Sequence, residues 1–370
     1  MRRTALWLLV AAAPLAAQEP AVGVATTART GVVLDGYYFG SGFAFDHVVE
    51  WTVPVTLSRR LGQRLTVDVA TAYAHASGAT TIGTLEVSGL TDTDVRASFA
   101  AAPGHLVLSL VATLPTGKKT VPDSTVPLLS ALATDVLDFT TPTFGSGGGV
   151  TGGFAYAVRL GERWAGGMGA SYRWHASYTP VAGTGELQPG GEGRARLGIE
   201  GPLGSGYLRS ALVYTASGAD TLGGGSRSIT GDRILVYAGV NFPAGRSSLS
   251  FYGYDMHRFR PRAYNSTNLN AVKVPRGNVL ALGARLDRPL SPAVNLAPNV
   301  EFRHELADAS AGNLHLLGWL VRPGVDVRYR ASGAVALLFQ GQAAFGRLAD
   351  NGSSVSLAGP RVVLLLEWSR

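Results

Sequence analysis

The sequence predicts an all-β protein, a transmembrane antiparallel up-and-down β-barrel of about 16 strands. Three observations point to this fold class. Apolar residues alternate with polar ones over many short stretches, short and long connections alternate along the chain, and mean hydropathy is +0.16. Yet no window beyond the N-terminus is an apolar run long enough for a transmembrane helix, so the apolar residues are spread over strands.

The N-terminal segment has the three parts of a secretory signal. Arg2 and Arg3 supply positive charge, an apolar run extends from Ala5 to Leu15, and Ala16 and Ala17 offer small residues for cleavage. This run is shorter than the roughly 20 residues that a membrane anchor needs, which disfavours that alternative. We therefore expect residues 1–17 to be a signal peptide and residues 18–370 to form an outer-membrane β-barrel.

Composition excludes several other classes of protein. The chain has no cysteine, which rules out a disulfide framework and a lipid-modified cysteine. Its net charge is +7, but the arginines form no contiguous basic run, so nucleic acid is not an expected partner.

Period-two alternation recurs through the mature chain. From Val49 to Ser58 the odd positions are apolar and the even positions mostly polar, and a similar pattern returns from Ile234 to Phe242. Such alternation places one set of side chains on each face of a strand. A soluble β-sandwich would show the same period, so alternation alone leaves both folds open.

The lengths of the connections favour the barrel. Seven short turns are predicted, at 60–63, 102–104, 160–162, 201–205, 243–245, 287–292 and 331–333. Between them lie eight longer polar segments, at 40–45, 77–91, 115–148, 177–191, 217–231, 258–275, 306–315 and 349–355. Tight periplasmic turns and long outer loops are typical of outer-membrane barrels. The count gives about 16 strands with both termini on the periplasmic side, while 12 or 14 strands stay open because strand boundaries slip easily.

The stretch from Glu50 to Thr116 resembles the outer-membrane porins found with meta-cleavage phenol-degradation operons. Three pieces carry the resemblance: VPVTLSRRLGQRLTVDVATAYA, LTDTDVRASF and LVLSLVATLPTGKK. Thr93-Asp94-Val95 stands where that family tends to have Gly-Asp-Val, and the likeness covers a fifth to a third of the chain. The resemblance implies passage of small, including hydrophobic, compounds across the outer membrane.

If the apolar set faces lipid, the charged set faces the lumen, because charges are costly on the lipid face. Candidate lumen residues along the solute path are Arg96, Arg173, Arg194, Arg196, Arg209, Arg233, Arg303 and Arg328. Arginine rings favour anions in a pore. The alternative is that these arginines pair with lumen carboxylates across strands and only keep the lumen wet.

Segment 115–148 is the longest predicted loop. Its part from Val126 to Leu137 could form a short amphipathic helix. One interpretation folds this segment into the barrel as a constriction loop, with Asp135 and Asp138 facing lumen arginines. The other leaves it outside, packed on neighbouring loops.

The predicted function is diffusion of small solutes, hydrophobic or anionic, without catalysis, cofactor or metal. The seven histidines are scattered and form no metal-ligand motif, and no G-x-S-x-G motif occurs. Expected partners are outer-membrane lipid, lipopolysaccharide, a small-molecule solute and the barrel-assembly machinery, which reads C-terminal aromatics such as Trp368; a homo-oligomer stays open. The alternative function is a non-conducting barrel that acts as a rim enzyme or as a surface scaffold or adhesion module.

Overall fold

The computed structural model describes residues 26–229, 231–259, 262–264, 272–273, 276–308, 314–350 and 353–370. The predicted signal peptide, residues 1–17, lies outside the described residues.

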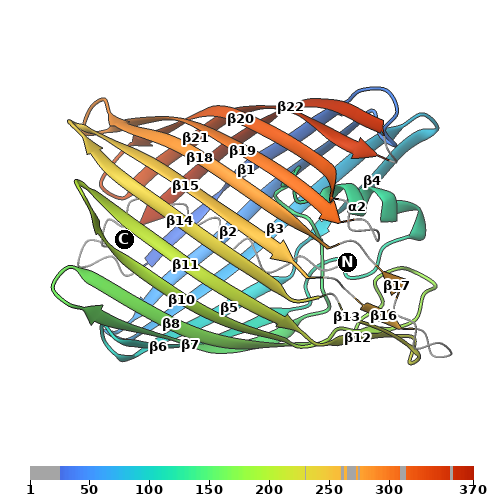
Figure 1. The fold of residues 1–370 in the computed structure, drawn as a ribbon, viewed down its shortest axis with the longest axis horizontal. Helices are drawn as coiled ribbons and strands as arrows, with labels where there is room; N and C mark the ends of the chain where they lie inside the picture. The colour runs from blue at the N-terminus through green and yellow to red at the C-terminus, as the bar shows by residue number, and fades with distance from the viewer. Residues whose placement is uncertain are drawn as a thin grey trace.

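The chain forms a closed antiparallel β-barrel with 16 strand positions, so the predicted fold class is confirmed (Figure 1). The first strand, β1 (Thr26–Phe39), pairs with the last, β22 (Ser353–Ser369), and this pairing closes the barrel. Between them, in order round the barrel, lie β2 (His47–Leu61), β3 (Leu65–Thr80), β4 (Gly83–Leu90) with β5 (Thr93–Ala102), β6 (Leu106–Leu114), β7 (Gly149–Leu160), β8 (Trp164–His175), β10 (Glu192–Leu203), β11 (Gly206–Ser217), β14 (Arg233–Ala244), β15 (Ser247–Arg258), β18 (Arg276–Pro289), β19 (Val294–Asp308), β20 (Leu314–Arg330) and β21 (Val335–Asp350).

Strands β4 and β5 share one strand position. β3 pairs with β5 over residues 65–70 and with β4 over residues 73–80, and the chain steps between them at residues 91–92. The 17 strands of the sheet therefore occupy 16 positions round the barrel.

The short connections lie at one end of the barrel, together with the chain ends. They are residues 62–64, 103–105, 161–163, 204–205, 245–246, 290–293 and 331–334. Thr26 and Arg370 exchange two backbone hydrogen bonds of 2.9 Å, which places both described chain ends at this end. The predicted asymmetry of the connections is thus present.

Three of the predicted long loops are wrong in extent. Residues 77–91 are mostly strand, because β3 runs to Thr80 and β4 begins at Gly83. Similarly, β21 runs to Asp350 with β22 starting at Ser353, and β19 reaches Asp308 with β20 starting at Leu314. Beyond the bilayer the outer face of a strand need not be apolar, so backbone pairing continues where the alternation of side chains ends.

The opposite end carries the longer connections (Figure 1). Residues 115–148 contain a 3-10 turn, η1 (Asp123–Thr125), and one short helix, α2 (Val126–Leu132). The helix ends five residues before the predicted Leu137. Three other connections form a small second sheet from β9 (Leu187–Gln188), β12 (Ala219–Leu222), β13 (Ser226–Ile229), β16 (Arg262–Tyr264) and β17 (Val272–Lys273).

The outer surface of the barrel is apolar. Large exposed side chains of one parity follow the strands round the wall, for example Leu110, Phe154, Leu212, Phe251 and Leu364. In the described residues, no helix is long and apolar enough to cross a membrane. A closed barrel with an apolar belt outside and charges inside places the chain in the outer membrane.

Candidate functional site

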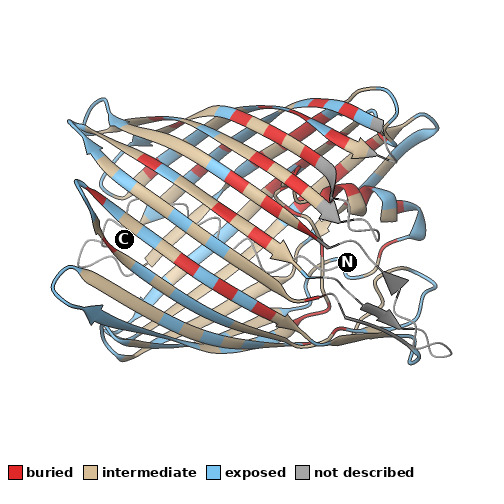
Figure 2. Cartoon of the chain, viewed as in Figure 1, coloured by how far each residue is buried: buried red, intermediate tan, exposed pale blue. Residues whose placement is uncertain are grey.

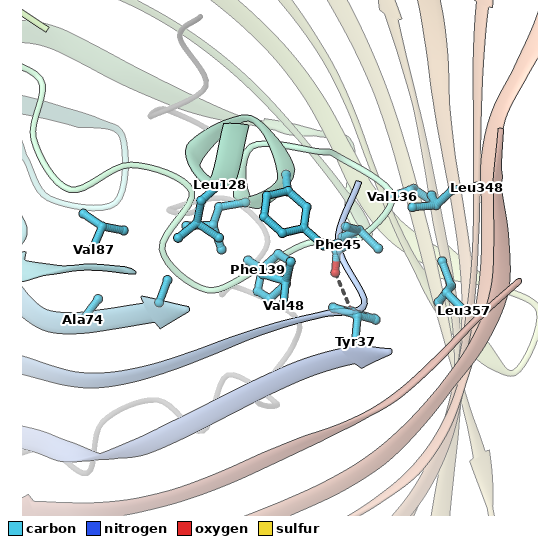
Figure 3. Close-up of a cluster of buried hydrophobic side chains, with 14 of the residues drawn as sticks. Tyr37, Phe45, Val48, Ala74, Val87, Leu128, Val136, Phe139, Leu348 and Leu357 are labelled. Atoms are coloured by element: carbon cyan, nitrogen blue, oxygen red, sulfur yellow. Dashed lines mark hydrogen bonds between the residues drawn. The ribbon is translucent and has the colours of Figure 1, made fainter. Parts of the chain in front are cut away.

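Residues 115–148, here called the lumen loop, fold inside the barrel. Buried loop side chains share one apolar cluster with inner-wall residues of β1 to β4 and of β20 to β22 (Figure 3). The same loop also forms ion pairs with β15 and β19. A single segment can contact so many strands round a closed barrel only from its interior. The structure therefore decides between the two interpretations of this loop in favour of the inward one.

Apolar packing fixes the loop against one wall. Leu128 and Leu132 of α2 are fully buried, as are Val136, Leu137 and Phe139 after it. The ring of Phe139 meets Tyr37 of β1 edge to face, with centroids 5.1 Å apart. Buried positions gather in the half of the barrel nearer the loops, where this packing occurs (Figure 2).

Asp138 is the electrostatic anchor of the loop. Its carboxylate lies 2.7 Å from Arg303, 3.0 Å from Arg322 and 3.5 Å from Arg361, which project from β19, β20 and β22. Arg303 and Arg322 are nearly fully buried, and Glu301 contacts Arg303 at 2.6 Å. Asp138 is also the only non-glycine residue with positive φ (+57°) among the described residues. A left-handed aspartate persists where its surroundings over-determine it, and here three arginines do so.

Hydrogen bonds from the following residues hold the loop to β1 and β2. The backbone N–H and the hydroxyl of Thr140 donate to Asp35 at 3.2 and 2.6 Å. The backbone N–H of Thr141 donates to Glu50 at 2.7 Å. Asp35 and Glu50 are each 1% exposed and face one another in the β1–β2 register. Glu50 faces inward, where it binds the loop and does not line open lumen.

Asp135 also faces arginines of the wall. Its carboxylate lies 2.9 Å from Arg258 of β15, and Arg258 in turn lies 2.6 Å from Glu305 of β19. Both predicted loop acids thus contact inner-wall arginines. Whether this arrangement constricts a solute path stays a prediction.

The strand register shows which other residues share the inner face. Directly opposite residues of neighbouring strands lie on the same face of a sheet. Arg303 pairs with Ala281, and the row continues through Tyr254, Tyr237, Ala211 and Gly198. Carried round the barrel, this face includes every predicted lumen arginine: Arg96, Arg173, Arg194, Arg196, Arg209, Arg233, Arg303 and Arg328.

Four of these arginines are neutralised by partners. Arg209 pairs with Glu200 at 3.1 Å, Arg233 with Glu192 at 3.1 Å, and Arg328 with Glu367 at 3.0 Å. Arg303 belongs to the Asp138 anchor. For these four arginines, the structure shows ion pairs with carboxylates inside the barrel.

The other four have no such partner. Arg96, Arg173, Arg194 and Arg196 form no ion pair with any residue in the described part of the chain. Arg173, Arg194 and Arg196 lie together on β8 and β10, where Arg194 is directly opposite Ser171 and Arg196 is opposite Gly169. Three of the four unpaired candidates therefore lie together on one wall.

That wall also carries small side chains. The inner face of β7 and β8 presents glycine, alanine and serine next to the unpaired arginines: Gly153, Ala155, Ala157, Gly167, Gly169 and Ser171. Ala155, Ala157 and Arg196 are exposed although they point inward, so solvent reaches the lumen here. The lumen loop is held to β1 to β4, β15 and β19 to β22, on another part of the wall. The arrangement leaves a charged, water-accessible side within the barrel.

The sequence prediction missed several residues of the anchor. Arg258, Arg322 and Arg361 were not among the candidates, and neither was Asp35. Odd or even position along a strand could have indicated that such residues face inward, since Arg322 lies on the same face of its strand as Arg328. Parity gives the face of a strand but not the loop residue that reaches it.

Catalytic and metal sites find little support in the described residues. No group of three or more potential ligands that could hold a metal is present in that part of the chain. Near the loop end, Asn278 bonds to His257 at 2.5 Å and to Asp255 at 3.2 Å on the outer face. Among the described residues, no hydroxyl group hydrogen-bonds to His257 as a nucleophile would, so this hydrogen-bonded group lacks the third member of a hydrolase triad.

Comparison with known proteins gives structural likenesses only. No model of a protein family matches the chain, and no curated protein matches it by sequence. Among solved structures it is similar to OccK5 (OpdH) of Pseudomonas aeruginosa, with 11% identity, a TM-score of 0.47 and coverage of 94% of this chain and 98% of that one. It is also similar to the outer-membrane channel DcaP of Acinetobacter baumannii (13%, 0.43, 95% and 98%) and to OmpT of Vibrio cholerae (9%, 0.42, 94% and 97%). The function of this chain is therefore argued from its own residues.

Proposed function

We propose that this protein is a passive outer-membrane channel for small solutes that favours anions. One observation carries the proposal: Arg173, Arg194 and Arg196 project into the lumen beside a wall of small residues, and none of them has an ion-pair partner in the part of the chain that the structure describes. An unneutralised row of arginines raises the local concentration of anions and lowers the barrier to their entry. The lumen loop lines the rest of the path and sets its width.

The charge distribution separates two sets of lumen residues. Carboxylates on the inner face of β18 to β22 are already paired, for instance Asp326 with Arg285 and Glu367 with Arg328. They supply a neutral, hydrated surface. On the opposite wall, Arg173, Arg194 and Arg196 have no ion-pair partner among the described residues, so they direct the field across the lumen.

The finer parts of the proposal concern solute and family. The likeness to porins of phenol-degradation operons favours small organic solutes, and the unpaired arginines favour acidic ones. Lipopolysaccharide and the barrel-assembly machinery are the further partners that we propose, while a homo-oligomeric state stays open.

The test is the reversal potential of the refolded protein in a planar bilayer across a KCl gradient. We expect stable open steps and a reversal potential on the chloride side. Replacing both Arg194 and Arg196 by glutamine should shift that potential toward zero, because two unpaired lumen charges are removed.

The matched control is Arg347→Gln. Arg347 lies opposite Trp319 and between inward-facing Gly346 and Leu348, so it is on the outer face. Its replacement removes one positive charge from the outer face and should leave the reversal potential unchanged. Protein that is shown to be folded but never conducts would overturn the channel proposal and favour a scaffold or rim enzyme.

A further inference from the structure

A group of three arginines with a single carboxylate lies on the inner wall formed by β8, β10, β11 and β14, which are consecutive round the barrel (Figure 1). Its members are Arg173 of β8, Arg194 of β10 and Arg233 of β14, here called the arginine group. Arg194 is directly opposite Thr215 of β11, and Thr215 is directly opposite Arg233. The carboxylate is that of Glu192, which is directly opposite Arg173.

The three arginines are close enough to contact one small ligand. Arg173 and Arg194 are diagonal neighbours across β8 and β10, and backbones in that relation lie about 7–8 Å apart, within reach of long side chains. Two strand spacings, about 10 Å, separate the backbones of Arg194 and Arg233. Arg173 and Arg233 also lie within electrostatic range of Arg194. Each guanidinium stands on a long side chain, so the three can approach a common point above β10 and β11.

Positive charge in the arginine group is not balanced. Glu192 contacts Arg233 at 3.1 Å, whereas no ion pair in the described part of the chain involves Arg173 or Arg194. Arg173 and Arg194 are both half-buried, and the buried Nε atom of Arg173 has no hydrogen-bond partner among the described residues. Three arginines and one carboxylate leave two positive charges uncompensated. Charge of one sign that is partly removed from water is costly without a counter-ion.

Hydroxyl groups lie next to the arginines on the same face. Thr151 is directly opposite Arg173, and Ser171 is directly opposite Arg194. In the described structure, the hydroxyls of Thr151, Ser171 and Thr215 form no hydrogen bond. A hydroxyl can donate to an oxygen of a ligand, as the N–H groups of arginine do. The wall here therefore combines several free donors with two uncompensated positive charges.

We infer that the arginine group binds small oxyanions of charge 2−, the chemistry that sulfate and hydrogenphosphate share, an inference that rests on the proposed function. Two negative charges balance the two positive charges that Glu192 leaves. The N–H groups of Arg173 and Arg194 donate to the oxygens of the anion, and the neighbouring hydroxyls complete its hydrogen bonds. A monovalent anion leaves one positive charge uncompensated.

The position of the group gives this site a place on the solute path. Arg173 is near the end of β8, and Arg233 is the first residue of β14. Both therefore lie at the end of the barrel that carries the long connections. A solute that enters from the outer side meets the arginine group before the short-turn end.

Equilibrium dialysis of labelled sulfate against the folded protein in non-ionic detergent tests the site directly, because it needs no conduction. Nitrate and inorganic phosphate are the competitors, at mildly alkaline pH, where phosphate is a dianion, and at constant ionic strength, because salt screens exposed charges. We expect phosphate to displace sulfate, and nitrate to require a concentration about tenfold higher or more, since nitrate lacks one of the two charges. Equal displacement by nitrate and phosphate would overturn the inference.

Two variants locate the bound anion. Arg173→Gln and Arg194→Gln should each weaken sulfate binding about tenfold or more, because each removes a charged donor that has no partner of its own. Resistance to heat on gels shows whether each variant is folded, and the competition on the wild type needs no variant. Unchanged sulfate binding in both folded variants would overturn the inference.

The matched control is Arg159→Gln. Arg159 lies on the inner face of β7, directly opposite Ala165 and next to the short turn at 161–163. Its replacement removes one positive charge from the lumen at the other end of the barrel. Sulfate affinity should change by less than about twofold, because solvent and salt screen charges at that separation. A loss as large as in the other two variants would mean that general lumen charge, and not the arginine group, binds sulfate.

Conductance measured on the same preparation separates the two claims. A channel that conducts chloride but does not prefer sulfate to nitrate keeps the proposed function and loses the dianion site. A folded barrel that binds sulfate selectively at Arg173 and Arg194 without conducting keeps the site and loses the channel.

Discussion

Removing the charge of Asp138 should release the lumen loop from the wall. Asp138→Asn keeps the shape of the side chain and tolerates the left-handed backbone (φ +57°), so the change acts mainly on charge. The wild-type carboxylate contacts three arginines, at 2.7, 3.0 and 3.5 Å, and two of them are nearly fully buried. Without it, their positive charges face one another beneath the loop.

The size of the effect follows from the burial of the anchor. Removing one partner of a buried ion pair costs about 3–5 kcal/mol. Glu301 remains 2.6 Å from Arg303 and 3.5 Å from Arg322, so the lower end of that range applies. About 3 kcal/mol corresponds to a roughly 100-fold larger population of released loop.

Single-channel recording measures this population. Transient steps of higher conductance should become at least tenfold more frequent in Asp138→Asn, while the barrel keeps its resistance to heat on gels. The control is Glu200→Gln, which breaks the exposed Glu200–Arg209 pair at 3.1 Å and should change stability by less than about 1 kcal/mol. If both variants gate like the wild type, Asp138 does not anchor the loop.

Other variants test the lumen and the outer wall. Gly167→Phe should lower conductance, because Gly167 belongs to the inner wall of small residues and has room for a Cβ. Gly152→Phe, on the outer face, should leave conductance unchanged. Equal conductance of the two variants would contradict the proposed path. Phe139→Ala should leave a cavity beside Tyr37, weaken loop packing by about 3–5 kcal/mol and raise the frequency of the same high-conductance steps, and unchanged gating would count against the apolar anchor. Leu212→Arg on the lipid face should reduce folding into bilayers by about 2–4 kcal/mol, while Ala155→Arg on the exposed inner face should fold normally, as urea titration in lipid vesicles can show.

Much of the wall could be predicted because its pattern is local. Leu110, Phe154 and Leu212 lie on the outer face by parity alone, and Arg194 and Arg196 lie on the inner face for the same reason. The short turns were predictable because tight connections need few residues. The ends of the strands were not, as residues 77–91 show, since pairing continues there without alternation.

Parity could not tell which arginines stay charged toward the solute. Arg209 and Arg196 lie on the same inner face of neighbouring strands, but only Arg209 has a carboxylate within reach, that of Glu200. Pairing depends on the register between strands and on the reach of each side chain. Neither the register nor the reach of a side chain can be predicted from the residue pattern of a single strand.

The sequence by itself determined the class of protein: an exported barrel with an apolar outer face, charged lumen and asymmetric ends. These properties follow from period-two patterning and connection length, which act between near neighbours. Only the tertiary structure decided that residues 115–148 fold inward and that Asp138 meets Arg303, Arg322 and Arg361. Those contacts join residues more than 160 positions apart, and a closed barrel must form before the loop has a wall to bind.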